Sequence, residues 1–325
     1  MLLTRRSFLA SSAGVGALAL PGRVSAQAPL NLRMSITATE ADPLFAAARR
    51  FAQKVAERTA GRIAITPFAG TQIGGEQQQF EALKLGVSQI AAVGLNGSDA
   101  FLSMFLPYVF RDMDHQGKVI DGPLGQPWKD DLLARQRVRF FGHAYQNPRQ
   151  LTASRSVRVP ADVVGLKIRV PQLPALVETW KALGAIPTPM GVNEIFMALQ
   201  QRVVDAQENP IEQIINNSFY EVQKYLVLLD YSRPVISVMA NDAAWRRIEP
   251  SDQEILADAW RTERESHKTE LQASEKERVE FVRGKGLEII TPDVAAFREA
   301  TKRVAQTLGE KSWGTGVYEK IVATA

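Results

Sequence analysis

The sequence of 325 residues contains no cysteine and only three histidines. Without cysteine the chain has no disulfide, no thiol nucleophile, no zinc–thiolate site and no iron–sulfur cluster. His115, His143 and His267 lie far apart and match no metal-binding spacing such as H-E-x-x-H. Glycine-rich phosphate loops and the G-x-S-x-G elbow are also absent. The sequence therefore predicts no metal site and no cofactor, and it makes no positive case for an enzyme, although catalytic pairs of carboxylates stay open.

Long apolar runs are scarce, and the clearest lies near the start of the chain. Residues 1–26 combine a pair of arginines, an uncharged stretch from Phe8 to Leu20, and small residues that end in Ala26. This stretch is too short to span a bilayer comfortably and is typical of a cleaved export signal. The paired arginines followed by Phe and Leu favour the twin-arginine route, with an ordinary secretory signal as the alternative. Either route predicts a periplasmic mature protein.

Excess positive charge is also nearly absent once this segment is removed. The whole chain has 39 Lys and Arg against 35 Asp and Glu, a formal net charge of +4. Arg5, Arg6 and Arg23 lie in the export segment, so the mature chain keeps 36 basic residues and a net charge of +1. A nucleic-acid partner requires a clustered excess of Lys and Arg, and none is expected here.

What remains is an ordinary globular composition, with 45% apolar and 23% charged residues. Strand-like and helix-like stretches alternate over residues 30–93, and the same alternation restarts over 167–200. This rhythm predicts two α/β lobes. Ser251 and Glu254 predict a capping box at the start of a long charged pattern, which we expect to form one or two surface helices reaching about Arg283.

Arg169 is the candidate binding residue that the local pattern singles out. It lies near the end of the predicted strand 167–170, between Ile168 and Val170. Ligands of α/β sheets bind at the carboxyl ends of strands, and a guanidinium in a dry crevice suits a planar carboxylate. The alternative is a structural ion pair with an internal Asp or Glu, and the residues alone do not separate the two.

Several ordered blocks resemble one family over essentially the whole mature chain. They include Gln72-Ile73-Gly74-Gly75-Glu76, Leu106-Pro107-Tyr108-Val109-Phe110, the G-L-K-I-R-V-P block at 165–171 and the V-D-A-Q-E-N-P block at 204–210. The chain resembles the DctP-type extracytoplasmic substrate-binding proteins of TRAP transporters, whose members bind organic acids such as C4-dicarboxylates and sialic acid. The resemblance implies a two-lobed α/β fold of the periplasmic-binding-protein kind, type II-like, with a cleft between the lobes and a long surface helix spanning them. By analogy lobe I takes residues 27–146 and 234–273, and lobe II takes 147–233 and 274–325.

The resemblance also assigns ligand-binding residues. Arg169 matches the arginine that clamps the ligand carboxylate, Arg149 matches a second arginine twenty residues upstream, and Asn209 matches the asparagine that contacts the ligand and the clamp. Alternatively, Arg149 forms a structural ion pair with a nearby carboxylate. Asn209 has the alternative, compatible with binding, of capping the next helix.

Three further residues are expected at the cleft. Glu76 matches an acidic residue at the pocket rim, or is a first-turn residue favoured by the helix dipole. Gln172, next to the clamp, and Tyr231, where many relatives carry histidine, are expected by position to line the cleft. Arg233 follows as a candidate for a second acidic group of the ligand, with a surface or hinge salt bridge as the expected alternative.

The function implied is that of a periplasmic solute-binding subunit, not an enzyme. It would capture a small organic acid between lobes that close around it and deliver the acid to the small and large membrane subunits of a permease. The alternatives are a binding protein that feeds a sensor and a secreted hydrolase that uses cleft carboxylates. The acid itself is not identified.

Overall fold

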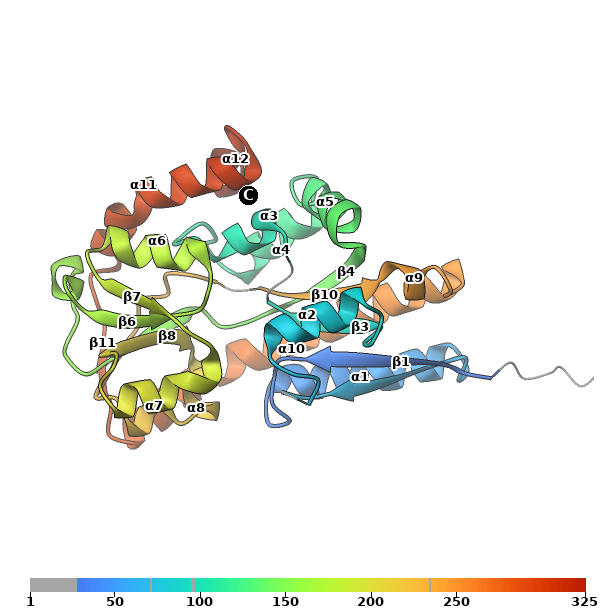
Figure 1. Ribbon diagram of the computed structural model, residues 1–325, viewed down its shortest axis with the longest axis horizontal. Helices are drawn as coiled ribbons and strands as arrows, with labels where there is room; N and C mark the ends of the chain where they lie inside the picture. Colours follow the sequence, from blue (N-terminus) through green and yellow to red (C-terminus); the bar gives the residue numbers. More distant parts are fainter. Residues whose placement is uncertain (1–27, 71, 95–96, 234) are drawn as a thin grey trace, which may run out of the picture.

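The computed structural model describes residues 28–70, 72–94, 97–233 and 235–325. The predicted export segment therefore lies outside the described residues. Within these ranges no helix is both long and apolar enough to cross a membrane. The chain forms two α/β bodies, each built on one β-sheet, and we call the body that contains β1 lobe I and the other lobe II (Figure 1). The predicted two-lobed α/β fold is confirmed.

Lobe I is built on a five-stranded sheet in the order β2-β1-β3-β10-β4. β1 pairs in parallel with β2 and β3, whereas β10 is antiparallel to β3 and β4. The strands are β1 (Leu30–Ile36), β2 (Ile63–Phe68), β3 (Ile90–Val93), β4 (Val138–Tyr145) and β10 (Val235–Asn241). The helices are α1 (Pro43–Arg58), α2 (Glu76–Lys84), α3 (Asp99–Leu102), α4 (Met113–Asp121), α5 (Gln126–Gln136) and α9 (Asp242–Trp245).

Local signals explain how lobe I begins. The Asp42 carboxylate accepts a hydrogen bond from the Leu44 N–H at 2.9 Å, and Pro43 takes the first helical position of α1. Phe51 and Val55 then recur on the face of α1 that is buried against the sheet. A second apolar cluster covers the opposite face of the sheet, so lobe I has a core on both sides.

Lobe II is built on a six-stranded sheet in the order β11-β9-β5-β8-β6-β7. β6 is parallel to β7 and β8, and β5 is antiparallel to both of its neighbours. The strands are β5 (Arg149–Ala153), β6 (Lys167–Val170), β7 (Ile186–Pro189), β8 (Ala206–Pro210), β9 (Tyr225–Val227) and β11 (Glu288–Ile290). The helices are α6 (Pro174–Ala182), α7 (Ile195–Gln200) and α8 (Ile211–Asn216).

The chain crosses between the lobes after β4, after β9 and along α10 (Pro250–Gly284), a single helix of 35 residues. Its N-cap residue is Glu249, and no side chain caps it. The predicted capping box is wrong, because Pro250 occupies the first helical position and Ser251 already lies inside the helix. The expected long surface helix is confirmed, as one helix rather than two.

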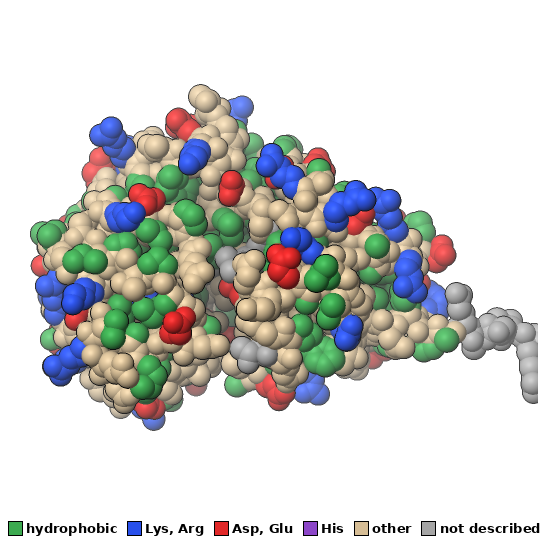
Figure 2. Space-filling view, viewed as in Figure 1, with side chains coloured by type: hydrophobic (Ala, Val, Ile, Leu, Met, Phe, Trp, Pro, Cys, Tyr) green, Lys and Arg blue, Asp and Glu red, His purple; other side chains and the backbone are tan. Residues whose placement is uncertain are grey.

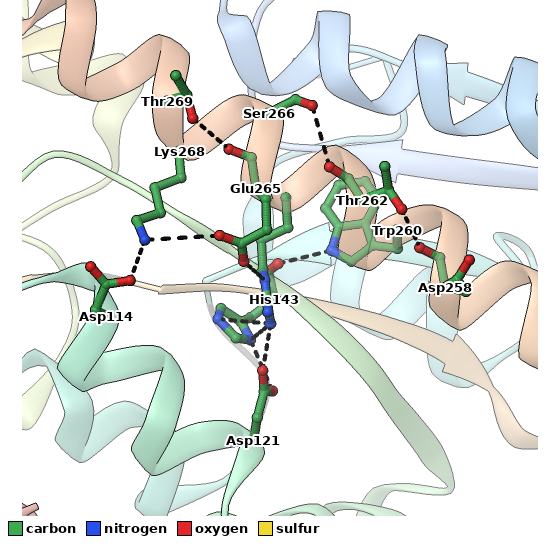
Figure 3. A network of polar contacts seen from close by, with 11 residues as sticks. Asp114, Asp121, His143, Asp258, Trp260, Thr262, Glu265, Ser266, Lys268 and Thr269 are labelled. Carbon is green, nitrogen blue, oxygen red and sulfur yellow. Dashed lines mark hydrogen bonds and ion pairs between the residues drawn. The ribbon is translucent and has the colours of Figure 1, made fainter. Parts of the chain in front are cut away.

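α10 is held by contacts at both ends. On lobe I the Trp260 indole donates to the His143 carbonyl at 2.8 Å, and Lys268 forms an ion pair with Asp114 (Figure 3). Near its other end Val282 is buried in a core cluster of lobe II. The helix therefore has fixed partners in both lobes.

The predicted lobe boundaries remain a prediction, and the C-terminal packing departs from them in one respect. α11 (Val294–Trp313) packs along α6 of lobe II, but it leads to α12 (Val317–Ala323) at the side of lobe I (Figure 1). Trp313 and Ile321 lie in one apolar cluster with Phe101 and Trp128 of lobe I. The last residues of the chain, predicted for lobe II, therefore cover lobe I.

Candidate functional site

A cavity of about 540 Å³ lies between the two lobes. In the space-filling view the surface is hollowed between the two bodies (Figure 2). Thr37, Phe105, Ile236 and the start of α2 line the cavity from lobe I, and the end of β6, residues 190–194 and the end of β8 line it from lobe II. Its volume falls in the range of sites for small molecules.

Sheet topology brings the predicted site residues of lobe II together. β6 and β8 are parallel neighbours, so Arg169 near the end of β6 and Asn209 near the end of β8 reach the same edge of the sheet. β5 runs antiparallel to β8, and its first residue, Arg149, is paired with Pro210. The start of β5 therefore lies at this edge too.

Arg169 lines the cavity and is 3% exposed. Its Nε and Nη2 atoms donate to the Met190 carbonyl at 3.0 and 2.7 Å. Among the described residues no carboxylate lies within ion-pair distance of its guanidinium, so the alternative of a structural ion pair is wrong. Burial lowers the pKa of Arg169 to about 10. The site thus holds a buried cation whose charge the described chain does not directly match.

Arg149 also lines the cavity, but its charge is matched. It forms an ion pair with Glu208, and its Nη2 donates to Oε1 of that carboxylate at 3.0 Å and to the Glu208 carbonyl at 2.7 Å. Glu208 is fully buried. The alternative of a structural carboxylate partner is therefore confirmed for Arg149. Glu208 was not predicted as a site residue, although it stands in the Q-E-N-P block.

Asn209 was expected to contact the clamp, Arg169, but it contacts Arg149 instead. Its Oδ1 accepts from Arg149 Nη2 at 3.1 Å, and its Nδ2 donates to Gln207 Oε1 at 2.5 Å. No hydrogen bond joins Asn209 to Arg169 in the described chain. The alternative of a helix cap is wrong, because Pro210 is the N-cap residue of α8 and no side chain caps that helix.

Glu76 and Gln172 line the cavity as expected. Glu76 is the first residue of α2, so it lies both at the cavity and in the first turn of a helix, the two positions expected for it. Its Oε1 accepts from the Gly94 N–H at 2.6 Å. Gln172 is exposed at the cavity wall, and its amide forms no hydrogen bond with another described residue.

Tyr231 does not line the cavity, and this expectation is corrected. The residue is 3% exposed, its hydroxyl donates to Glu208 Oε2 at 2.5 Å, and that hydroxyl accepts from Trp180 Nε1 at 3.2 Å. Tyr231 therefore binds Glu208, the carboxylate that is paired with Arg149, and neither Tyr231 nor Glu208 is among the described residues that line the cavity. Arg233 is also not among the residues that line the cavity.

The prediction from sequence missed the amides and apolar side chains of the wall. Gln79, Gln146 and Gln213 line the cavity, as do Phe105 and Met190. No local signal marks these residues, because glutamine in a helix or loop is ordinarily a solvated side chain.

No group of three or more His, Asp or Glu side chains in the described part of the chain is arranged to hold a metal ion. None of the three histidines is among the described residues that line the cavity.

Two α/β lobes joined by several chain segments, with a cavity of small-molecule size between them, define a two-lobed solute-binding protein. The sequence model of the DctP family, bacterial extracellular solute-binding protein family 7, matches residues 34–312. The chain belongs to this family. Its members are extracytoplasmic binding proteins rather than enzymes.

Relatives match over nearly their full length. A solute-binding protein of Roseobacter denitrificans is 31% identical over 304 residues, which cover 93% of each chain. The sialic acid-binding periplasmic protein SiaP of Vibrio cholerae is 28% identical over 95% of this chain and 97% of its own. A solved TRAP periplasmic solute-binding protein from R. denitrificans with bound L-galactonate has a TM-score of 0.82 at 29% identity, and covers 90% of this chain and 98% of its own.

Proposed function

We propose that this protein is the periplasmic solute-binding subunit of a TRAP transporter that captures a small organic acid and hands it to the membrane subunits of a permease. The observation that carries the proposal is Arg169, a buried guanidinium at the cavity wall without a carboxylate partner in the described chain. A buried cation is stabilised by a bound anion, and the planar fork of arginine fits a carboxylate.

The ligands of solved relatives support the class of solute. Proteins at 29% identity from R. denitrificans were crystallised with L-galactonate and with 3-deoxy-D-manno-oct-2-ulosonic acid. A relative at 25% identity from a Polaromonas species holds D-erythronate. Each of these solutes carries a carboxylate, the group that Arg169 is suited to bind.

Binding is proposed to proceed without covalent chemistry. The carboxylate of the solute pairs with Arg169, while Arg149 and Asn209 supply further polar contacts from the same edge of the sheet. The lobes then close by bending at the crossings after β4 and β9. Closure excludes water and lowers the local dielectric, which strengthens the charged hydrogen bonds.

A screen of the mature protein against organic acids tests this proposal. Solutes that bind the folded state raise its midpoint of thermal unfolding, and calorimetry then measures their affinity. We expect at least one organic acid to bind, and the matching neutral alcohol not to bind. If no organic acid binds, or if the protein turns an acid ester or glycoside over at an enzymatic rate, the proposal is wrong.

Export and delivery need separate measurements. A tagged full-length protein should be found in the periplasmic fraction of its host and be lost from it in a strain without the twin-arginine translocase. Retention of export in that strain would assign the segment to the general secretory route instead. Uptake of the identified acid should disappear when the permease genes are deleted.

A further inference from the structure

The charges on the cavity wall restrict which organic acid fits, and this inference rests on the proposed function. Four charged side chains line the cavity in the described part of the chain: Glu76, Arg149, Arg169 and Glu194. Glu208 already neutralises Arg149. The wall therefore offers one guanidinium without a carboxylate partner, together with two carboxylates.

A solute with a second carboxylate would find no second unmatched cation among these residues. Its far carboxylate would share the cavity with Glu76 on α2 and Glu194, the N-cap residue of α7. Once the lobes have closed and excluded water, like charges repel more strongly than in bulk solvent. The described wall therefore favours a solute with one negative charge, bound at Arg169.

The uncharged part of the wall is rich in side-chain amides. Gln79 is 1% exposed, and its Nε2 donates to the Gly70 and Gly74 carbonyls at 2.6 and 3.0 Å, so it shapes the wall rather than offering its amide to a solute. Gln146 and Gln172 line the same cavity, and their amides form no hydrogen bonds with other described residues. The amides of Gln146 and Gln172 each offer two donors and an acceptor, which complement hydroxyl groups.

Apolar groups complete the wall of the cavity. Phe105 and Ile236 line the cavity from lobe I and are each less than one-tenth exposed. The C–H faces of a carbon chain can pack on such groups while its hydroxyls reach the amides. We infer that the cavity takes a polyhydroxylated monocarboxylate, such as an aldonate or a uronate, in preference to a dicarboxylate or an unsubstituted fatty acid.

Calorimetry with solutes of matched chain length tests this inference. The four-carbon set is erythronate, threonate, tartrate, succinate and butyrate, and the six-carbon set is galactonate, gluconate, galacturonate, galactarate and hexanoate. We expect at least one hydroxylated monocarboxylate to bind ten times more tightly than every dicarboxylate and every unsubstituted acid in its set. If a dicarboxylate binds most tightly, the inference is overturned while the proposed function stands. If none of the acids binds, and the wider screen also finds none, the proposed function fails with it.

A pair of variants isolates the effect of charge. Glu76→Gln removes a carboxylate from the cavity wall but keeps an oxygen that can accept from the Gly94 N–H. Glu81→Gln removes the same charge from the same helix, at a residue that pairs with Lys84 and does not line the cavity. We expect Glu76→Gln to raise the affinity for galactarate relative to galactonate at least fivefold, and Glu81→Gln to leave the ratio within twofold. An unchanged ratio in Glu76→Gln would overturn the assignment of the repulsion to this carboxylate.

Discussion

The two cavity arginines should respond in opposite ways to the same substitution. Arg169→Met keeps a long unbranched side chain and removes the charge. Burial lowers the pKa of Arg169 from 12.5 to about 10, so the folded protein disfavours the charged form by about 3 kcal/mol. The variant also loses the hydrogen bonds to the Met190 carbonyl, which contribute about 1–2 kcal/mol. We therefore expect the ligand-free variant to be more stable than the wild type by about 1–2 kcal/mol.

Arg149→Met is the matched control, at a cavity residue twenty positions earlier in the chain. Here the charge is paired with Glu208, whose side chain has no exposed surface. Removing the arginine leaves a buried carboxylate without its cation, a change that destabilises proteins by about 3–5 kcal/mol. The two variants differ in whether the chain itself provides the counter-charge.

Urea titration of the ligand-free proteins, followed by tryptophan fluorescence and by circular dichroism, measures the free energies of unfolding. Calorimetry with the identified acid measures binding, which Arg169→Met should weaken by about 2–5 kcal/mol, or roughly 30-fold to several-thousand-fold. Arg169→Lys should also weaken binding, because a point charge does not reproduce the guanidinium fork. If Arg169→Met is less stable than the wild type by more than about 1 kcal/mol, or if it binds the acid within twofold, the reasoning about an unmatched charge is refuted.

Three further predictions concern residues outside the cavity wall. Burial lowers the pKa of His267 from its ordinary 6.5 to about 4. Between pH 6.5 and pH 4 the unfolded chain therefore binds a proton at His267 that the folded chain does not bind. The free energy of unfolding falls as the pH drops through this range. His267→Phe should reduce this loss by about 2 kcal/mol in urea titrations at pH 7.5 and pH 4.5, and equal losses would contradict the assignment. Tyr231→Phe removes a buried hydroxyl bound to Glu208 and should destabilise the protein by about 1–3 kcal/mol, with affinity for the acid kept within threefold; a tenfold loss would place Tyr231 at the ligand. Trp313→Ala should destabilise the protein by about 3–5 kcal/mol in the same titrations, because this side chain is buried against lobe I; a change below 1 kcal/mol would mean that the C-terminal helices contribute little.

Several features of this fold could be predicted from short stretches of sequence. Asp42 followed by Pro43 is a local signal for the start of a helix, and α1 begins at Pro43. The apolar strand 167–170 placed Arg169 at a carboxyl end, which topology turns toward the cavity. These two features follow from local sequence because the start of α1 and the end of β6 each depend on residues within a few positions of one another.

Other features depend on segments that are distant in the chain. β10 lies antiparallel between β3 and β4, although it follows β4 by about ninety residues. All seven of its residues are buried, and such an apolar strand could pair with its neighbours in either direction, so its sequence does not predict the antiparallel pairing. Tyr231 was expected at the ligand and instead binds Glu208. The position of Tyr231 relative to the family blocks did not distinguish a contact with the ligand from a contact with Glu208. Both positions require a polar side chain near the same edge of the sheet.

The sequence by itself determined the α/β rhythm, the family and the arginine that we propose as the clamp. Only the tertiary structure decided that Arg149 is paired with Glu208 while Arg169 has no carboxylate within ion-pair distance in the described chain. The physical reason is that ionic pairing is a property of neighbours in space. Two arginines at the same edge of one sheet acquire different electrostatic states. β5 and β8 align a carboxylate with Arg149, whereas the residue after β7 offers Arg169 only a backbone carbonyl.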